Sequence, residues 1–317
     1  MIEVAVTHKE QETDDILRFE LARPDNQPLP AFDPGAHIDV HLPGNLIRQY
    51  SLCNHPAESQ RYWIAVLKDP ASRGGSIAMH EQVGVGDRLQ ISEPRNRFPL
   101  AEIAERSLLL AGGIGITPIL CMAQALSSAG EAFSMHYCAR SKSKMAFMQQ
   151  IKDSAFAQQV QFHFDDDEPA QHFDVDSVLS NPTPGTHLYV CGPAGFLDYV
   201  LNSAASHGWP SEQLHREYFS AAPVAHSEDG SFEVEIKSTG EVIPIPAGRS
   251  ALHVLEDAGI DIPVSCEEGI CGTCVTRVLE GTPDHRDRFM TDEEHALNDR
   301  FAPCCSRAKS GRLVLDL

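Results

Sequence analysis

The stretch C-E-E-G-I-C-G-T-C, residues 266–274, decides how the last part of this chain folds. It sets Cys266, Cys271 and Cys274 at the spacing C-x4-C-x2-C, and Cys304 follows after 29 intervening residues. This spacing is typical of plant-type [2Fe–2S] centres, in which cysteine thiolates are the ligands of the iron. We therefore predict that these four cysteines hold a [2Fe–2S] cluster.

The two glycines of this loop agree with that prediction. Gly269 and Gly272 allow the backbone to turn closely around a cluster and to direct amide N–H groups at its sulfur atoms. Zinc ligands or buried structural cysteines are the alternatives, but zinc sites usually pair their ligands at short spacings. Cys305 is expected to be a bystander. The cysteines expected to be small core residues are Cys53, Cys121 and Cys138.

The segments around the loop predict a small domain over residues 231–317. Two strands are expected at 232–237 and 241–246, a helix at 250–258, and a final strand at 313–317. Residues 220–231 are small and polar and contain Pro223 and Gly230, which is typical of a linker between domains. We expect this domain to have the β-grasp fold of plant-type ferredoxins.

The first hundred residues have a different pattern. Short apolar or alternating runs are separated by Pro, Gly and Asn, and they occur at 2–7, 16–21, 37–42, 62–67 and 88–92. This spacing predicts a small all-β barrel over residues 1–101. The run R-Q-Y-S at 48–51 is by itself compatible with an ordinary strand. The run R-G-G-S at 73–76 precedes a helical pattern at 77–82, and a glycine turn at a helix N-terminus can bind phosphate.

Strands alternate with helices over residues 102–222, which predicts a parallel α/β domain. Strands are expected at 107–110, 133–138, 160–164 and 187–190, with helices at 119–129 and 194–207. The run A-G-G-I-G-I-T-P at 111–118 joins the first strand to the first helix. It differs from the Rossmann pattern G-x-G-x-x-G, but its glycines and helix N-terminus would equally suit a pyrophosphate.

The order of barrel, nucleotide domain and ferredoxin domain resembles the phthalate dioxygenase reductase family, the class IA reductases of Rieske oxygenase systems. Within that family the resemblance is to the vanillate O-demethylase reductase type. It covers nearly the whole chain. The segments that carry it are 47–54, 67–76, 91–100, 110–123, 188–193, 214–219, 264–276 and 284–287.

The resemblance implies a flavin site in the barrel. Arg48 would bind the flavin phosphate, Tyr50 would pack along the ring and ribityl chain, and Ser51 would hydrogen-bond near flavin N5. The resemblance favours FMN, and the residues themselves leave FAD open. The other residues assigned to the flavin site are Gln49, Val66, Lys68, Gly74, Gly75 and Ser76.

The resemblance also implies a nicotinamide site. Cys191 would lie beside the nicotinamide, and Phe219 would shield the face of the flavin; with Ser51 they form the predicted catalytic set. The usual acidic ribose ligand is missing after the strand at 133–138, where Arg140 begins a basic run that would favour NADPH. The resemblance favours NADH. The other residues assigned to this site are Gly112, Gly113, Gly115, Thr117, Gly192 and Pro193.

Composition narrows the classes of partner. The chain has 317 residues, 42% of them hydrophobic, and a formal net charge of −20, which argues against nucleic acid. The uncharged stretch 107–130 is long enough for a membrane span, but its glycines and Pro118 predict a strand, turn and helix instead. The first fifteen residues do not resemble a signal peptide, so we expect a cytoplasmic protein. We also expect it to be a monomer.

These observations together predict an electron-transfer flavoprotein. NADH would reduce the flavin, the [2Fe–2S] cluster would follow, and a terminal Rieske oxygenase acting on an aromatic compound, with O-demethylation as an example, would receive the electrons. Two alternatives are weighed against it. A redox sensor would have degraded flavin or nicotinamide motifs, and a self-contained monooxygenase would need a further metal site; neither feature is visible in the sequence.

Overall fold

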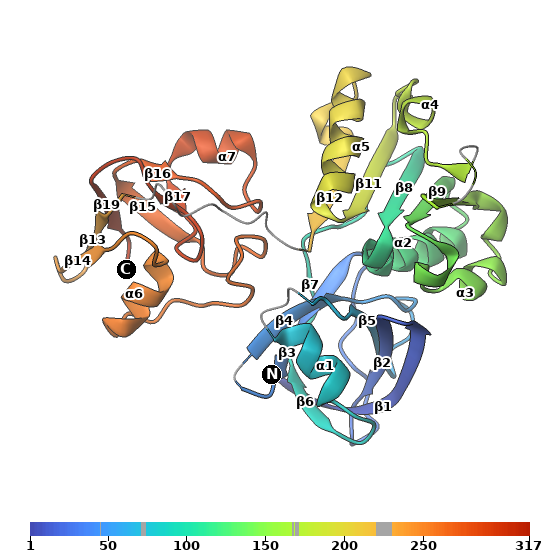
Figure 1. Cartoon of the computed structure of the whole chain (residues 1–317), viewed down its shortest axis with the longest axis horizontal. Helices are drawn as coiled ribbons and strands as arrows, with labels where there is room; N and C mark the ends of the chain where they lie inside the picture. The colour runs from blue at the N-terminus through green and yellow to red at the C-terminus, as the bar shows by residue number, and fades with distance from the viewer. Residues whose placement is uncertain (45, 71–73, 167, 169–170, 220–229) are drawn as a thin grey trace. The chain divides into compact units, whose positions relative to one another are not determined.

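The computed structural model describes residues 1–317 except 45, 71–73, 167, 169–170 and 220–229 (Figure 1). The chain divides into two compact units, Met1–Glu217 and Tyr218–Leu317. Most of the predicted linker at 220–231, and Arg73 of the R-G-G-S run, lie outside the described residues.

The first unit begins with a seven-stranded antiparallel sheet in the order β4-β3-β6-β1-β2-β5, with β7 paired to β3. Cys53, just after β4, donates its N–H to the carbonyl oxygen of Trp63 on β5 at 2.9 Å, so the two ends of this order meet and the sheet closes as a barrel. Helix α1 contributes the buried Ala78 and Met79 to the barrel core. The bounds are β1 Ile2–Thr13, β2 Ile16–Ala22, β3 Ala36–Leu42, β4 Leu46–Ser51, β5 Tyr62–Leu67, α1 Gly75–Glu81, β6 Arg88–Ile91 and β7 Arg95–Asn96.

A second sheet of the same unit has five strands in the order β10-β9-β8-β11-β12. Strand β8 pairs in parallel with both β9 and β11, and β9 pairs in parallel with β10. The strand order reverses between β8 and β11, and open α/β sheets bind ligands at the carboxyl ends of the strands at such a reversal. The strands are β8 Arg106–Gly112, β9 Phe133–Ala139, β10 Val160–Phe164, β11 Thr186–Gly192 and β12 Leu214–Tyr218.

The connections of this sheet are mostly helical. The longer helices are α2, which follows β8 through η1, and α5, which follows β11 (Figure 1). Among the described residues, no helix is long and apolar enough to cross a lipid bilayer. The helices are η1 Gly113–Gly115, α2 Ile116–Ala129, η2 Lys142–Lys144, α3 Met148–Lys152, η3 Ala157–Gln159, α4 Val175–Leu179, α5 Ala194–Ser206 and η5 Ser211–Gln213.

The second unit contains a mixed five-stranded sheet in the order β14-β13-β19-β15-β17, in which β13 and β19 are parallel. Helix α6 packs its buried Ala251, Leu252 and Leu255 against this sheet, which gives the predicted β-grasp architecture. Strands β16 and β18 form a separate antiparallel pair. The bounds are β13 Phe232–Ile236, β14 Val242–Ile245, α6 Ala251–Asp257, β15 Thr276–Glu280, β16 Pro283–Asp284, α7 Asp292–Leu297, β17 Arg300–Phe301, β18 Arg307–Ala308 and β19 Arg312–Leu315.

The predicted fold class is confirmed: a β-barrel, an α/β sheet and a ferredoxin-like domain follow one another along the chain. The predicted domain boundaries at 101 and 222 stay predictions, because the chain separates into two units rather than three.

Candidate functional site

The four predicted cluster ligands lie in the second unit and are all buried. Cys266, Cys271 and Cys274 come from the loop between α6 and β15, and Cys304 from the turn after β17. Gly269 and Gly272 have φ angles of 72° and 66°, a region that glycine enters without strain, so the loop can fold back on itself.

The thiols of the four cysteines interact in two pairs. A hydrogen bond from Cys266 lowers the pKa of the Cys271 thiol to about 5, and one from Cys304 lowers the pKa of the Cys274 thiol. Backbone N–H groups also point at sulfur: Glu268 N lies 3.3 Å from Cys266 Sγ, and Thr273 N lies 3.4 Å from Cys271 Sγ. Four converging thiols, two of them readily ionised, and amide donors to sulfur fit a [2Fe–2S] cluster.

Arg48 lies against the first turn of α1. A Cβ atom added to Gly75 would come within 2.4 Å of Arg48 Cγ and 2.5 Å of Arg48 Nε, so the arginine side chain crosses directly over this glycine. Gly74 caps the helix with a φ angle of 90°, and Arg48 donates from Nη1 to the Ile47 carbonyl oxygen at 2.7 Å. An arginine fork beside helical N–H groups suits one phosphate, so these residues fit the phosphate end of a flavin.

Ser51, at the end of β4, is buried and donates its hydroxyl to Glu217 Oε2 at 3.1 Å. Glu217 comes from β12, and loss of solvation raises the pKa of its carboxyl to about 8. Burial raises the pKa of the Cys191 thiol well above its usual value, and the nearby charge of Glu217 raises it further. The structure thus brings Ser51 and Cys191 around one carboxyl group.

Sequence reasoning did not single out Glu217. In the segment 214–219 the sequence points to Phe219, whereas a single glutamate in a short strand forms no recognisable motif. The signal that could have found it is an acidic residue in an otherwise ordinary edge strand beside the reversal of strand order. Phe219 itself follows β12 and is partly buried, and its role at the flavin stays a prediction.

The remaining residues assigned to the flavin site are mostly bonded within the protein. Gln49 donates from Nε2 to Asp39 Oδ1 at 2.9 Å, and Tyr50 packs on the barrel core, where burial raises the pKa of its phenol. Lys68 pairs with Glu81 at 2.9 Å. Ser76 accepts from the Asp69 N–H at 3.2 Å. Val66 is buried on β5.

The glycines assigned to the nicotinamide site meet at the reversal of strand order. A Cβ atom on Gly115 would lie 2.3 Å from the Cys191 carbonyl oxygen, and one on Gly192 would lie 3.0 Å from the Gly112 Cα. The Phe196 ring, 2.8 Å from the Cβ position of Gly112, covers the same place. The glycine turn after β8 and the end of β11 therefore lie in direct backbone contact. This geometry fits a pyrophosphate beside η1 and α2.

Four further predicted residues lie around this turn. Gly113 has a φ angle of 54°, and Thr117 is buried and donates to the Ile114 carbonyl oxygen at 3.1 Å. Pro193 caps α5 and is exposed. Arg140, after β9, is exposed as well.

Comparison with known proteins agrees with this arrangement. The model of the 2Fe-2S iron-sulfur cluster binding domain matches residues 234–309, and that of the DmmA-like N-terminal domain of dimethylamine monooxygenase subunits matches residues 92–214. The chain is similar to vanillate O-demethylase oxidoreductase from Pseudomonas sp. strain HR199, with 57% identity and 100% of both chains covered. It is also similar to phthalate dioxygenase reductase from Burkholderia cepacia, with 40% identity over 100% of this chain and 97% of that protein.

A solved structure agrees over the same length. The structure described as phthalate dioxygenase reductase, a modular structure for electron transfer from pyridine nucleotides to [2Fe-2S], matches with a TM-score of 0.78 and 40% identity. The match covers 100% of this chain and 98% of that one. The chain therefore belongs to the family of [2Fe–2S] oxidoreductases that contains the vanillate O-demethylase oxidoreductases and phthalate dioxygenase reductase.

Proposed function

We propose that the chain is the reductase component of an aromatic Rieske oxygenase system, with vanillate O-demethylation as the first reaction to test. The observation that supports this most is the presence, in one chain that matches its relatives end to end, of a cysteine site, a phosphate cradle and a glycine turn at the reversal of strand order. When bound, flavin and cluster would supply the conversion of a hydride into single electrons.

The protein's own residues would bind and orient these groups. Arg48 and the first turn of α1 would hold the flavin phosphate, and the Ser51 hydroxyl, fixed by Glu217, would be directed at the flavin. Gly112, Gly115 and Gly192 would admit the nucleotide. We propose FMN as the flavin, on the resemblance to the family. Identification of the flavin released on denaturation, FMN or FAD, tests this choice.

We propose NADH as the electron donor. The basic run after β9 is the feature that would favour NADPH, but two of its lysines are already engaged. Lys144 pairs with Asp15 at 2.8 Å, and Lys142 stands over the Phe164 ring at 5.4 Å. Arg140 is exposed, and the engagement of the two lysines leaves less positive charge for a 2′-phosphate. Measuring the turnover rate with NADH and with NADPH tests this choice.

We also propose a monomer in the cytoplasm, with a barrel over residues 1–101, a nucleotide domain over 102–222 and the ferredoxin domain over 231–317.

The proposed function can be tested directly on the purified protein. The purified protein should contain flavin and [2Fe–2S] cluster, reduce cytochrome c with NADH, and support vanillate turnover by a Rieske oxygenase. Protein without flavin, or without NADH-dependent cytochrome c reduction, would contradict the proposal.

Arg48→Ala is expected to weaken flavin binding about 10- to 150-fold. One charge-assisted hydrogen bond to a phosphate is worth about 1.5–3 kcal/mol, and each 1.4 kcal/mol corresponds to a tenfold change in affinity. Fluorescence titration of the flavin-free protein measures the effect. Arg88→Ala is the matched control, because Arg88 lies on β6 of the same sheet and pairs with the exposed Glu3 at 2.6 Å. Equal losses in both variants would remove Arg48 from the phosphate site.

Glu217→Gln is expected to reduce the loss of stability that the unit Met1–Glu217 shows as the pH rises. The pKa of Glu217 is raised from 4.5 to about 8, so the folded protein keeps its proton in a range where the unfolded chain has lost it. Stability therefore falls as pH rises between about 4.5 and 8, and glutamine removes this dependence. Melting curves followed by flavin fluorescence at pH 5 and pH 8 measure it. The exposed Glu212→Gln serves as control, and a parallel pH dependence in all three proteins would refute the assignment.

A further inference from the structure

A short segment after β16, Asp287–Met290, lies against both glycines of the cluster loop; we call it the brace. A Cβ atom on Gly269 would lie 3.0 Å from Asp287 Cα, and one on Gly272 would lie 2.5 Å from the Phe289 ring. Arg288 also donates its backbone N–H to the Gly269 carbonyl oxygen at 2.8 Å. The loop that carries three of the cluster ligands thus rests directly on the brace.

The carboxylate of Asp287 fixes the shape of the brace. Its side chain is fully buried, and Oδ2 accepts from the Met290 N–H at 2.9 Å, which closes the brace on itself. Oδ1 accepts from the Ser306 hydroxyl at 3.4 Å, and Ser306 in turn accepts from the Arg286 N–H at 3.1 Å. Ser306 stands two residues after Cys304. Asp287 therefore joins the segment of the fourth ligand to the loop of the other three.

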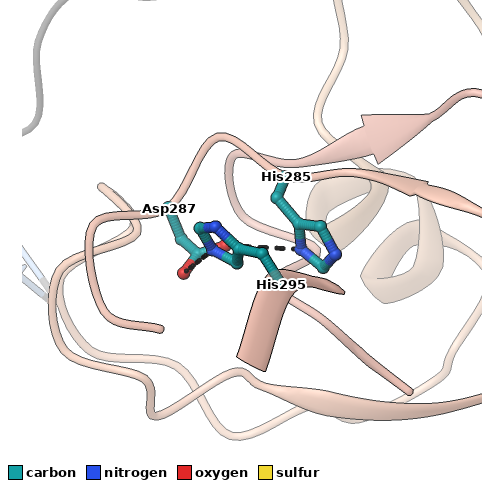
Figure 2. Close-up of side chains that lie close together, drawn as sticks. All are labelled: His285, Asp287 and His295. Atoms are coloured by element: carbon teal, nitrogen blue, oxygen red, sulfur yellow. Dashed lines mark hydrogen bonds and ion pairs between the residues drawn. The ribbon is translucent and has the colours of Figure 1, made fainter. Parts of the chain in front are cut away.

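Two histidines stand beside this carboxylate (Figure 2). His295 Nε2, from α7, lies 3.2 Å from Asp287 Oδ2, and His285 Nδ1 lies 3.9 Å from Oδ1. The two imidazole rings stack on each other, with centroids 4.4 Å apart and planes 17° apart. A buried carboxylate needs hydrogen bonds and a nearby positive charge, and His295 is placed to supply both when protonated.

The same three side chains have the composition of a divalent-metal site, and both ring nitrogens of His285 are buried without a hydrogen-bond partner. The ring geometry opposes this use. A zinc ion lies about 2.0–2.1 Å from each imidazole nitrogen and near the plane of each ring. Two nearly parallel rings with centroids 4.4 Å apart have no position that lies in both planes at that distance. The arrangement instead suits a carboxylate contacted by His295, with the His285 ring stacked on that of His295.

We propose that Asp287 is a positioning residue for the [2Fe–2S] cluster. Through the brace it fixes the cluster loop relative to Cys304, and thereby the amide donors and negative charge around the cluster sulfur atoms. Such surroundings determine the reduction potential of a cluster and how firmly it is held. This inference rests on the cluster site alone, so it does not depend on which nucleotide, flavin or oxygenase the proposed function assigns.

Asp287→Asn and Asp287→Ala in the full-length holoprotein test the proposal. Asparagine keeps the shape but loses the charge, and it should give an altered EPR spectrum of the reduced cluster and a less negative midpoint potential. Alanine removes every contact of the carboxylate, and it should release iron to a chelator several-fold faster than the parent. Should the alanine variant fail to fold, the asparagine variant still carries the test.

Asp284→Asn is the matched control. It makes the same charge change three residues away, at a carboxylate that pairs with Arg286 at 2.8 Å. It should leave the spectrum, the potential and the rate of iron release unchanged. If both Asp287 variants behave like this control, the proposal is wrong. Zinc titration of the parent provides a second check: one tightly bound zinc per chain, lost in His285→Ala and His295→Ala, would make the triad a metal site and overturn the positioning role.

Discussion

Cys274→Ser should abolish NADH-dependent reduction of cytochrome c while NADH still reduces the flavin. Cys274 is buried among the other three cysteines, and its thiol is the one that Cys304 helps to ionise. A serine hydroxyl gives up its proton far less readily than a thiol, so the cluster loses a ligand that iron requires. All four cysteines lie in the unit Tyr218–Leu317, whereas the Arg48 cradle and the glycine turn lie in Met1–Glu217. The two activities should therefore separate.

Cys305→Ser is the control for this experiment. Cys305 follows the predicted ligand Cys304 directly, is partly buried and hydrogen-bonds to its side chain, so the same atom is exchanged in the same turn while all four predicted ligands are kept. Cytochrome c reduction, the 2Fe–2S absorbance and rapid-mixing flavin reduction are measured for both variants. Loss of flavin reduction in Cys274→Ser would contradict the separation of the two units, and loss of the cluster in Cys305→Ser would contradict the ligand assignment.

The second large effect is expected at the nicotinamide turn. In Gly115→Ala the new Cβ would lie 2.3 Å from the Cys191 carbonyl oxygen and 2.6 Å from the Gly192 nitrogen. Both are backbone atoms that cannot turn aside, so η1 must move away from the end of β11. Overpacking of this kind costs about 1–3 kcal/mol. We expect flavin reduction by NADH to need about 5- to 150-fold more NADH, since each 1.4 kcal/mol is a tenfold change.

Gly195→Ala separates this clash from the general effect of adding a methyl group. Gly195 lies in the first turn of α5, with open space around its Cβ position, and alanine favours a helix by about 1 kcal/mol over glycine. This variant should match the parent or melt slightly higher. The KM for NADH in ferricyanide reduction and the melting temperature are the measurements. A Gly115→Ala protein with the parent's KM would show that this turn does not hold the nucleotide.

Local patterns predicted the elements that carry strong hydrophobic runs. The strands at 62–67 and 160–164 have the bounds expected, because apolar residues and turn residues mark both ends. The helix expected at 119–129 begins earlier, at Ile116, since η1 leads into it without a break. Helix α7 was missed although its capping box of Thr291 and Glu294 is present, because the helix has no buried residue and so no apolar periodicity.

The cofactor motifs could be read from the sequence because most of the residues of each lie within one short segment, and only Cys304 stands apart. The loop with the first three cysteines, the glycine turn after β8 and the Arg48 strand are short runs with recognisable spacing. Glu217 and Asp287 could not be found in this way. Glu217 meets Ser51 from a strand 166 residues away in the chain, and Asp287 meets Ser306 across 19 residues, so only the fold brings these partners together. Burial, which gives both carboxyl groups their importance, has no local signature.

The central claim is that one chain passes electrons from NADH through a flavin to its [2Fe–2S] cluster. Rapid anaerobic mixing of the purified protein with NADH, followed by absorbance of the flavin and of the cluster, tests it most directly. The account predicts that flavin absorbance falls first and that cluster absorbance then falls in the same molecules, without an added mediator. A cluster that stays oxidised after the flavin is reduced, or a protein whose absorbance NADH does not change, would contradict it.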